Sequence, residues 1–420
     1  MCAMSPPACG RASLAAPFGV PAFDRADDAT AALFRTLEPA RAALGARAPF
    51  VLHDQLEIHR IPAPTGLEGT RAAWVADRFR ALGLEHVIVD AAGNVRGERT
   101  GERGLAPVVV GAHLDTVFDA ATPLAVQRDG LRYVAPGIAD NARGLAALVA
   151  IAAACNGTLL RTRRPLLFVA TTGEEGAGDL RGAKALFDEL GEHVASAVMI
   201  DGAGDEAIVH KALGARRLRV QWQGDGGHSW NAFGTANALH AAAGCAARLA
   251  AISLPRHPRT TLSVTRMAGG HAINAIPAEA WLEVDCRSTD TGTLDRLARE
   301  VERAAATATA EENHRARRDT ATLRVTVTTI GARPCGELPA THPLVVAAAS
   351  ATRLTGGLPS LDLASTDASV PIARGIAAIT IGAGGSAGGA HTMDEWYDDR
   401  GSARGLVRAL TIVAAASGLG

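Results

Sequence analysis

The sequence predicts an α/β protein in which a mostly parallel-sheet main domain is interrupted by a smaller inserted α+β domain. A chain of 420 residues is longer than one hydrophobic core usually fills. Strand-like and helix-like segments alternate up to about residue 204, and a different order of segments follows before the first pattern resumes. We expect a disordered leader at residues 1–24 and a first part of the main domain at 25–213. The insertion then covers residues 214–333, and the second part of the main domain covers 334–420.

The first part of the main domain begins with helical patterns at about residues 28–46 and 50–60, which end at the prolines and glycine of RIPAPTG. Residues 67–84 have apolar residues at helical spacing, and residues 86–99 predict two strands around a Gly-Asn turn. Three apolar strands then alternate with two helices, in the order 106–115, 139–155, 164–175, 177–190 and 194–204. This alternation is typical of a mostly parallel sheet covered by helices.

The insertion has the order β-α-β-β-α-β, which is typical of a ferredoxin-like sandwich. Its expected elements are residues 215–225, 237–252, 260–270, 278–288, 292–316 and 322–334. A helix at 342–356 and a strand at 376–385 resume the α/β pattern, so the main domain is discontinuous.

Composition excludes several classes of protein. The net charge of −1 favours neither a nucleic-acid partner nor an anionic membrane surface. The apolar stretches are too short to span a bilayer, and the leader lacks the basic and apolar regions of a signal peptide. The six cysteines are scattered without close pairs, which indicates reduced thiols and a cytoplasmic location.

Possible metal ligands follow the predicted strands of the main domain. They stand at five separate strand ends or helix starts, and Lys and Arg are scarce among them: His113 and Asp115, Asp140, Glu174 and Glu175, Asp201, and His391. In an open α/β sheet, functional groups gather beyond the carboxyl ends of the strands. Each residue alone has a simpler explanation, such as a helix cap at Asp140 or a solvated turn at the two glutamates. Their coincidence favours a shared site.

Two histidines and several carboxylates at one sheet edge are suited to a pair of divalent cations. Two such ions repel each other, so they need a bridging carboxylate and further anionic ligands. The donor set fits zinc, with cobalt or manganese as alternatives. Two adjacent glutamates also allow a division of roles, in which one binds a metal and the other takes a proton from water.

At this point the sequence resembles the M20 metallopeptidase family. The motifs GAHLDTV, GIADNARG, TTGEEGAGDLRGAK, MIDG and GGAHTMDEW occur in the order of that family, and GGHSW and NAIPAEAWLEVDCRS resemble its lid. The resemblance covers about residues 50–420, and the tripeptidase-T-like branch is the most similar one. It implies a zinc-exopeptidase-like main domain and a dimerisation lid, and thus a homodimer.

The resemblance also implies a role for each residue of the strand-end set. Asp140 bridges two metal ions, His113 and Asp201 complete one of them, and Glu175 and His391 complete the other. Glu174 is the general base, and Asp115 lies behind His113 and orients its ring. The bond between Asp140 and Asn141 is expected to be cis.

The same resemblance assigns four residues of the insertion. His228 reaches the active site of the partner subunit and polarises the scissile carbonyl. Asn274 binds substrate near that carbonyl, while Arg287 and Arg333 engage a substrate carboxylate. For each of these residues an ordinary turn or surface role is the competing interpretation.

The predicted activity is metal-assisted hydrolysis of an amide bond in short peptides. Asp at position 201 favours an aminopeptidase or a di- or tripeptidase, because in the family Glu at this position accompanies carboxypeptidases and deacylases. An N-acyl or N-carbamoyl amino acid amidohydrolase and a carboxypeptidase remain alternatives. A non-catalytic dimeric binding protein on the same scaffold is a further alternative, although all the expected ligand positions are filled.

Overall fold

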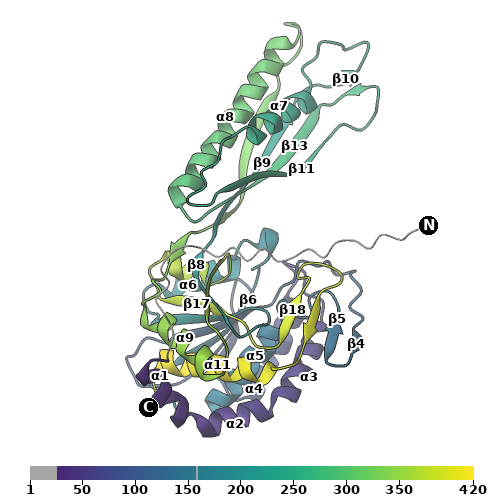
Figure 1. The fold of residues 1–420 in the computed structure, drawn as a ribbon. Helices are drawn as coiled ribbons and strands as arrows, with labels where there is room; N and C mark the ends of the chain where they lie inside the picture. Colours follow the sequence, from purple (N-terminus) through teal and green to yellow (C-terminus); the bar gives the residue numbers. More distant parts are fainter. Residues whose placement is uncertain (1–25, 158) are drawn as a thin grey trace, which may run out of the picture.

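The computed structural model of the chain describes residues 26–157 and 159–420. These residues form a broad body around a nine-stranded sheet and a narrower lid that stands on it (Figure 1). The lid is the part built from residues 214–333. The expected leader, residues 1–24, falls outside the described residues. Within the described ranges, no helix combines the length and apolarity needed to cross a membrane.

The large sheet is parallel at its centre, where β6, β3, β7 and β17 are neighbours. On either side of this centre the pairing becomes antiparallel, from β6 to β2 and from β17 to β8. The strand order is β1 (Glu85–Val89), β2 (Val95–Arg99), β6 (Leu166–Thr171), β3 (Val108–His113), β7 (Ser196–Ile200), β17 (Ala378–Ile381), β8 (Ala207–Ala212) and β15 (Gly336–Glu337), with β16 (Ser360–Ala364) also paired to β8. The prediction of an α/β fold with a largely parallel central sheet is confirmed.

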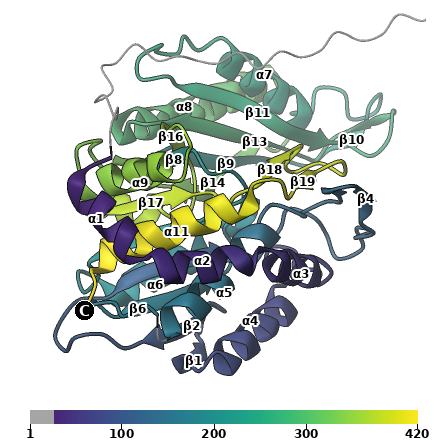
Figure 2. The same cartoon turned by 60° about the horizontal axis from the view of Figure 1, so that its bottom comes forward.

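Helices cover both faces of this sheet, so the central strands are buried throughout. Because side chains alternate along a strand, Val108 and Val110 join the cluster on one face while Val109 joins the cluster on the other. The first face packs against α1 (Asp28–Thr36), α2 (Glu38–Ala46), α3 (Ala48–His59), α4 (Gly69–Ala81), α5 (Ala142–Asn156), α9 (Pro343–Leu354) and α11 (Ser402–Ser417). The second face packs against α6 (Arg181–Leu190) and α10 (Ser369–Ala373). Figure 2 shows α1, α2 and α11 lying together across the first face.

The N-terminal helices are more divided than their periodicity predicts. The expected helix over 28–46 is two helices, α1 and α2, and α3 begins at Ala48. Pro39 and Pro49 lie in the first turns of α2 and α3. Proline lacks an N–H and is favoured at a helix start, so each proline begins a new helix instead of continuing the preceding one.

The lid is a four-stranded antiparallel sheet with two helices on one face. Its chain order, β-α-β-β-α-β, is the expected one: β9 (Gly214–Gln223), α7 (Ala238–Ala250), β11 (Thr261–Gly269), β13 (Glu279–Ser288), α8 (Thr291–Arg315) and β14 (Arg324–Arg333). In space the strands lie in the order β11-β13-β9-β14, and burial alternates along β13 as a half-covered sheet requires. Two further short strands, β10 (Gly227–His228) and β12 (Ala275–Ile276), pair antiparallel although α7 and β11 lie between them in the chain. Figure 1 shows β10 at the far end of the lid from the large sheet.

A second four-stranded sheet lies beside the body and was not foreseen. Its strands have three residues each, in the order β18 (Ser386–Gly388), β19 (Trp396–Asp398), β5 (Arg132–Val134) and β4 (Gln127–Asp129). Strands this short are below the length at which alternation can be recognised. The small sheet brings together the segments that lead to Asp140 and His391.

Candidate metal centre

The seven residues of the strand-end set meet at the carboxyl edge of the parallel centre. His113 ends β3, Glu174 and Glu175 follow β6, and Asp201 follows β7. Asp140 lies just before α5, and His391 lies between β18 and β19. Residues separated by up to 278 positions are therefore neighbours because parallel strands end at the same edge.

Asp140 lies between the two histidines. Its Oδ1 is 3.1 Å from His113 Nε2, and its Oδ2 is 3.3 Å from His391 Nε2. On the first side, Asp201 Oδ1 is 3.4 Å from His113 Nε2. On the second side, Glu175 Oε1 is 2.9 Å from His391 Nε2. The cluster thus has two halves that share one carboxylate.

The ligand atoms of each half are close enough to surround one ion. The atoms of His113, Asp140 and Asp201 lie within 4.8 Å of one another, and so do those of Asp140, Glu175 and His391. His113 Nε2 and Asp140 Oδ1 are also buried without a hydrogen-bond partner. Buried polar atoms are normally satisfied, so these unpaired atoms fit a cation between them. Nitrogen and carboxylate donors are the set that divalent transition metals prefer.

The pKa values of the cluster reflect this crowding. Burial alone would lower the pKa of His113, but its contacts with Asp115, Asp140 and Asp201 raise it well above the ordinary value. Hydrogen bonds to Asp140 and Glu175 raise the pKa of His391 to about 10. Without a metal, each histidine therefore holds a proton where positive charge is favoured.

The Asp115 carboxylate supports the glutamate loop. The ring Nδ1 of His113 lies 3.1 Å from the Asp115 carbonyl oxygen but 3.6 Å from the nearer carboxylate oxygen. The carboxylate accepts hydrogen bonds from the backbone N–H groups of Glu174 (3.0 Å) and Glu175 (2.9 Å). Burial opposes ionisation of Asp115, but its interaction with His113 and the hydrogen bonds from the Glu175 N–H and the Thr65 hydroxyl lower its pKa to about 2. Asp115 thus fixes the backbone of both glutamates as well as contacting His113.

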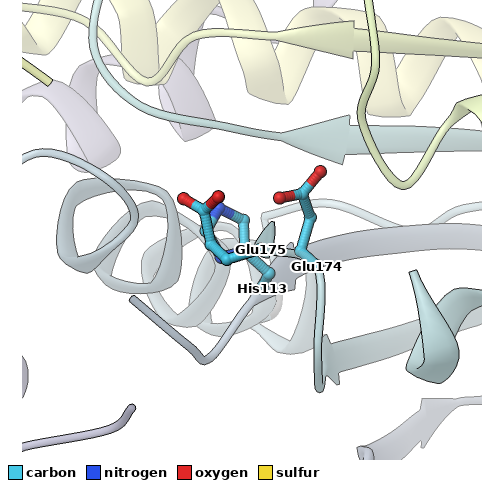
Figure 3. Close-up of side chains that lie close together, drawn as sticks. All are labelled: His113, Glu174 and Glu175. Atoms are coloured by element: carbon cyan, nitrogen blue, oxygen red, sulfur yellow. The ribbon is translucent and has the colours of Figure 1, made fainter. Parts of the chain in front are cut away.

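Glu174 belongs to a third possible ligand group, because its carboxylate, His113 and Glu175 each offer a ligand atom within 4.8 Å of the other two. Figure 3 shows these three side chains near one another, with the Glu175 carboxylate closer to the His113 ring than the Glu174 carboxylate is. Glu174 is only 5 % exposed, and burial raises its pKa well above the ordinary value although His113 and Arg333 lower it. Arg333 Nη1 lies 3.3 Å from Glu174 Oε1.

The backbone around Asp140 is held by residues that the sequence reasoning did not assign. The buried carboxylate of Glu395 accepts hydrogen bonds from the N–H groups of Gly137 (3.0 Å), Ala139 (2.8 Å) and Asp140 (3.0 Å). Asn141, not Asp140, caps α5 by accepting a 3.0 Å hydrogen bond from Gly144 N–H. The expected cis bond between Asp140 and Asn141 is confirmed.

Of the two supporting residues Glu395 and Thr65, the first could have been sought from the sequence. Glu395 stands in the motif GGAHTMDEW, only four residues after His391. Thr65 gave no such signal, because the RIPAPTG segment was interpreted only as a helix break. Its hydroxyl donates a 2.8 Å hydrogen bond to Asp115 Oδ2, which makes this segment part of the support of the cluster.

Of the predicted residues of the insertion, His228 lies in β10 and Asn274 directly precedes β12, the strand that pairs with β10. Both residues are exposed, and His228 pairs with Ala275. The Ser229 N–H donates a 2.9 Å hydrogen bond to the Asn274 carbonyl, which joins the two segments. No contact between the β10–β12 pair and the strand-end cluster is found among the described residues.

The two predicted arginines have different surroundings. Arg287 Nε donates a 2.8 Å hydrogen bond to Asp285 on the same lid strand. Arg333, at the end of β14, is buried and donates to the Glu174 carboxylate, the Glu174 carbonyl and Ser365. The structure therefore brings Arg333 into the strand-end cluster and leaves Arg287 on the lid.

Comparison with known proteins agrees with this architecture. The model of peptidase family M20/M25/M40 matches residues 109–416. Succinyl-diaminopimelate desuccinylase of Corynebacterium glutamicum is 29 % identical over 247 residues, covering 57 % of this chain and 66 % of that protein. The chain thus spans just under two thirds of the length of this curated relative.

Two solved structures share the fold over nearly their whole length. The aminopeptidase PepT of Bacillus cereus has a TM-score of 0.69 and 20 % identity, over 88 % of this chain and 99 % of that one. A hydantoinase/carbamoylase family amidase of Burkholderia vietnamiensis has a TM-score of 0.67 and 18 % identity, over 88 % and 98 %. At these identities the likeness is one of fold.

The strand-end cluster is a candidate metal-binding site at the carboxyl edge of a mostly parallel sheet. The chain belongs to peptidase family M20/M25/M40, a metal-dependent family, and is an enzyme of the M20 type.

Proposed function

We propose that the protein is a dinuclear metal-dependent amide hydrolase, and specifically an exopeptidase that acts as an aminopeptidase or a di- or tripeptidase on short peptides. The observation that carries this proposal is the two-sided cluster around Asp140, with a buried glutamate beside it. A single shared carboxylate between two ligand groups is what a pair of adjacent cations requires.

In this proposal, His113 and Asp201 hold one ion, Glu175 and His391 hold the other, and Asp140 bridges them. The contacts of 3.1 and 3.3 Å from the two oxygens of Asp140 to the two histidines support this assignment. When bound, divalent ions supply Lewis-acid polarisation and lower the pKa of water. Zinc is the proposed metal, with cobalt or manganese as alternatives.

Glu174 is the proposed general base. It accepts a proton from the attacking water and passes it to the leaving amine. Its position supports this role, because its buried carboxylate lies close to His113 and Glu175 but belongs to neither of the two ligand groups that share Asp140. The Asp115 carboxylate accepts hydrogen bonds from the N–H groups of both glutamates, which fixes the proposed base Glu174 relative to the proposed ligand Glu175.

The lid residues are proposed to act on substrate from a second subunit. His228 and Asn274 are exposed and lie at the paired strands β10 and β12, and Figure 1 shows β10 at the end of the lid away from the large sheet. We therefore propose a homodimer formed through the lid, in which His228 polarises the scissile carbonyl and Asn274 binds near it. Arg287 is the proposed partner of a substrate carboxylate, and Arg333 could serve such a group only by leaving Glu174.

The alternatives differ in the substrate end that is recognised. An N-acyl or N-carbamoyl amino acid amidohydrolase is supported by the similarity to the desuccinylase and to the amidase. A carboxypeptidase would depend on Arg287 or Arg333. A non-catalytic dimeric binding protein is disfavoured by the complete ligand set. A cytoplasmic location is part of the proposal and follows from the scattered cysteines.

The experiment compares three matched peptide sets with protein loaded with zinc, cobalt or manganese. One set has a free amino terminus, one is acetylated, and one is amidated at the carboxyl terminus; products are identified by mass spectrometry. We expect cleavage of the unmodified and amidated peptides, with release of the first residue. Removal of the acetyl group from the acetylated peptides would contradict the proposal and indicate a deacylase. If acetylated peptides were cleaved and amidated peptides were not, the protein would be a carboxypeptidase. Absence of cleavage with every metal would favour the non-catalytic binding protein.

A further inference from the structure

The loop that carries Glu174 and Glu175 is bonded directly to the two strands at the base of the lid. The chain enters the lid through β9 and leaves it through β14. From β9, Arg217 donates a hydrogen bond to the Gly176 carbonyl. From β14, the Ala332 N–H lies 3.0 and 2.9 Å from the two carboxylate oxygens of Asp179.

The last residue of β14 extends this connection to the proposed base. Arg333 donates to the carbonyl of Glu174 and lies 3.3 Å from its Oε1. Three positions of the loop, residues 174, 176 and 179, are thus each bonded to a lid strand. On its other side the loop is anchored to the large sheet, because Asp115 accepts from the N–H groups of Glu174 and Glu175.

The backbone at Asp179 is in an unfavourable conformation. Asp179 has a φ of 55° and Leu180 a φ of 61°, so two successive non-glycine residues lie in the left-handed region. This region costs L-residues roughly 1–2 kcal/mol each, although Asp tolerates it better than Leu. Such conformations persist where surrounding contacts determine them and are concentrated at functional sites. Here Leu180 is fully buried, and the Asp179 carboxylate is held by Ala332 and by Lys184 at 2.5 Å.

The shape of β14 permits the close approach of Asp179. The register between β14 and β9 shifts between Thr329 and Gly331. A Cβ atom at Gly331 would lie only 3.1 Å from Asp179 Oδ1. A glycine after a strand irregularity therefore leaves room for the carboxylate to reach the next N–H group, which belongs to Ala332.

We propose that Asp179 is a positioning residue that couples the orientation of the lid to the placement of Glu174. Because β14 belongs to the lid, rotation of the lid moves Ala332 and Arg333 together. The bond from Ala332 to Asp179 carries that movement into the glutamate loop, while Arg333 acts on Glu174 directly. The inference depends on the proposed role of Glu174 as base.

The ion pair with Lys184 is the competing reason for a carboxylate at position 179. Lys184 lies in α6, four positions after Leu180, and is not part of the lid. If the only role of Asp179 were its ion pair with Lys184 at the start of α6, removing Lys184 would have the same effect as removing Asp179. A matched pair of variants therefore separates the two roles.

The test uses the metal-loaded, full-length protein and its Asp179→Gly, Asp179→Asn and Lys184→Met variants. Asp179→Gly removes both oxygens while allowing a positive φ, and Asp179→Asn keeps one acceptor for Ala332 and is also tolerated in this region. We measure kcat and KM on a cleaved peptide, the metal content, and hydrogen exchange of the segments 173–182 and 324–334.

For Asp179→Gly we expect kcat to fall roughly 10- to 100-fold, since small misplacement of a catalytic group has effects of this size. KM is expected to change by less than about twofold and metal content to stay the same, because the ligands of the cluster do not contact Asp179. Exchange in both segments should become faster. Asp179→Asn should restore most of kcat, and Lys184→Met should resemble the unmodified protein.

The coupling is overturned if Asp179→Gly keeps its kcat, if Lys184→Met loses as much, or if Asn does not restore turnover. Hydrogen exchange decides the question even if the unmodified protein cleaves no peptide, an outcome that would refute the proposed function instead. In that case, unchanged exchange at residues 173–182 in Asp179→Gly would overturn the coupling, and faster exchange there and at 324–334 would support it.

Discussion

The strand-end cluster and the β10–β12 pair of the lid differ in how their side chains are held. In the cluster, His113 is 2 % exposed and Asp115 is fully buried. Beside the β10–β12 pair, by contrast, Trp230 is 84 % exposed and Ile273 is fully exposed. Burial and backbone hydrogen bonds fix the first region before any substrate arrives. The second region is exposed, and its function depends on what is placed against it.

Because of this difference, we expect the two regions to respond differently to substitution. Removing a metal ligand, or a group that supports one, from the cluster leaves buried partners unpaired, so metal binding should weaken. Removing a group from the β10–β12 pair should leave the fold and the metals unchanged and affect only the step in which that group contacts substrate.

Glu174→Gln is expected to have the largest effect on turnover. The substitution keeps the size of the side chain and removes its ability to accept a proton, so kcat should fall by roughly 10²–10⁴-fold. Metal content should stay at the level of the unmodified protein, because Asp140 and its four neighbours are untouched. Kinetics and elemental analysis check both statements, and retained turnover would refute the assignment of the base.

His228→Ala is expected to lower kcat by roughly 10²–10³-fold, the usual effect of removing one group that stabilises an oxyanion. His240→Ala is the matched control, because His240 is another exposed histidine of the lid. The dimer should persist in sedimentation or light scattering. Mixed dimers of His228→Ala and Glu174→Gln subunits should recover part of the activity; no recovery would exclude action across subunits.

Asp115→Asn is expected to weaken metal affinity by roughly 10–100-fold, the usual effect of losing a partner that supports the ligands. An amide cannot accept from both Glu174 and Glu175 N–H as the carboxylate does. Competition with a chelator measures the affinity. Asp119→Asn, in an exposed loop, is the control and should bind metal normally; equal affinities in the two variants would contradict the supporting role of Asp115.

The smallest effect concerns α3, which supports the segment before Asp140. His59 is buried, its ring lies 3.1 Å from the Pro136 carbonyl, and burial lowers its pKa to about 4. Between pH 6.5 and about 4, His59 is therefore more protonated in the unfolded chain than in the folded protein. The free energy of unfolding falls as the pH falls through this window. From pH 7 to pH 5 this one group should remove about 2 kcal/mol of unfolding free energy.

Urea unfolding of the unmodified protein and of His59→Gln at both pH values measures this contribution. The glutamine keeps an N–H donor for Pro136 but does not titrate, so its loss of stability between pH 7 and pH 5 should be smaller by that amount. Equal losses in the two proteins would show that His59 is not the titrating group.

Much of the fold and of the candidate site could be predicted because their signals are local. The buried runs ending in His113 and Thr171 are long enough to be recognised, and each is followed at once by its ionisable residues. The β-α-β-β-α-β order of the insertion is likewise visible in its periodicity. The small sheet of β4, β5, β18 and β19 was missed because three-residue strands have no measurable period.

The long helices and strands, the carboxyl edge of the parallel strands, and the set of histidines and carboxylates placed there follow from the sequence alone. The tertiary structure was needed to find that the Asp115 carboxylate accepts from the glutamate loop, that Glu395 holds the backbone before Asp140, and that Arg333 contacts Glu174. The ends of long strands can be predicted because the pattern of apolar residues is local, and parallel pairing brings those ends to one edge of the sheet. The partner of a buried side chain depends instead on which distant backbone groups need a hydrogen bond, and no short segment of sequence contains that information.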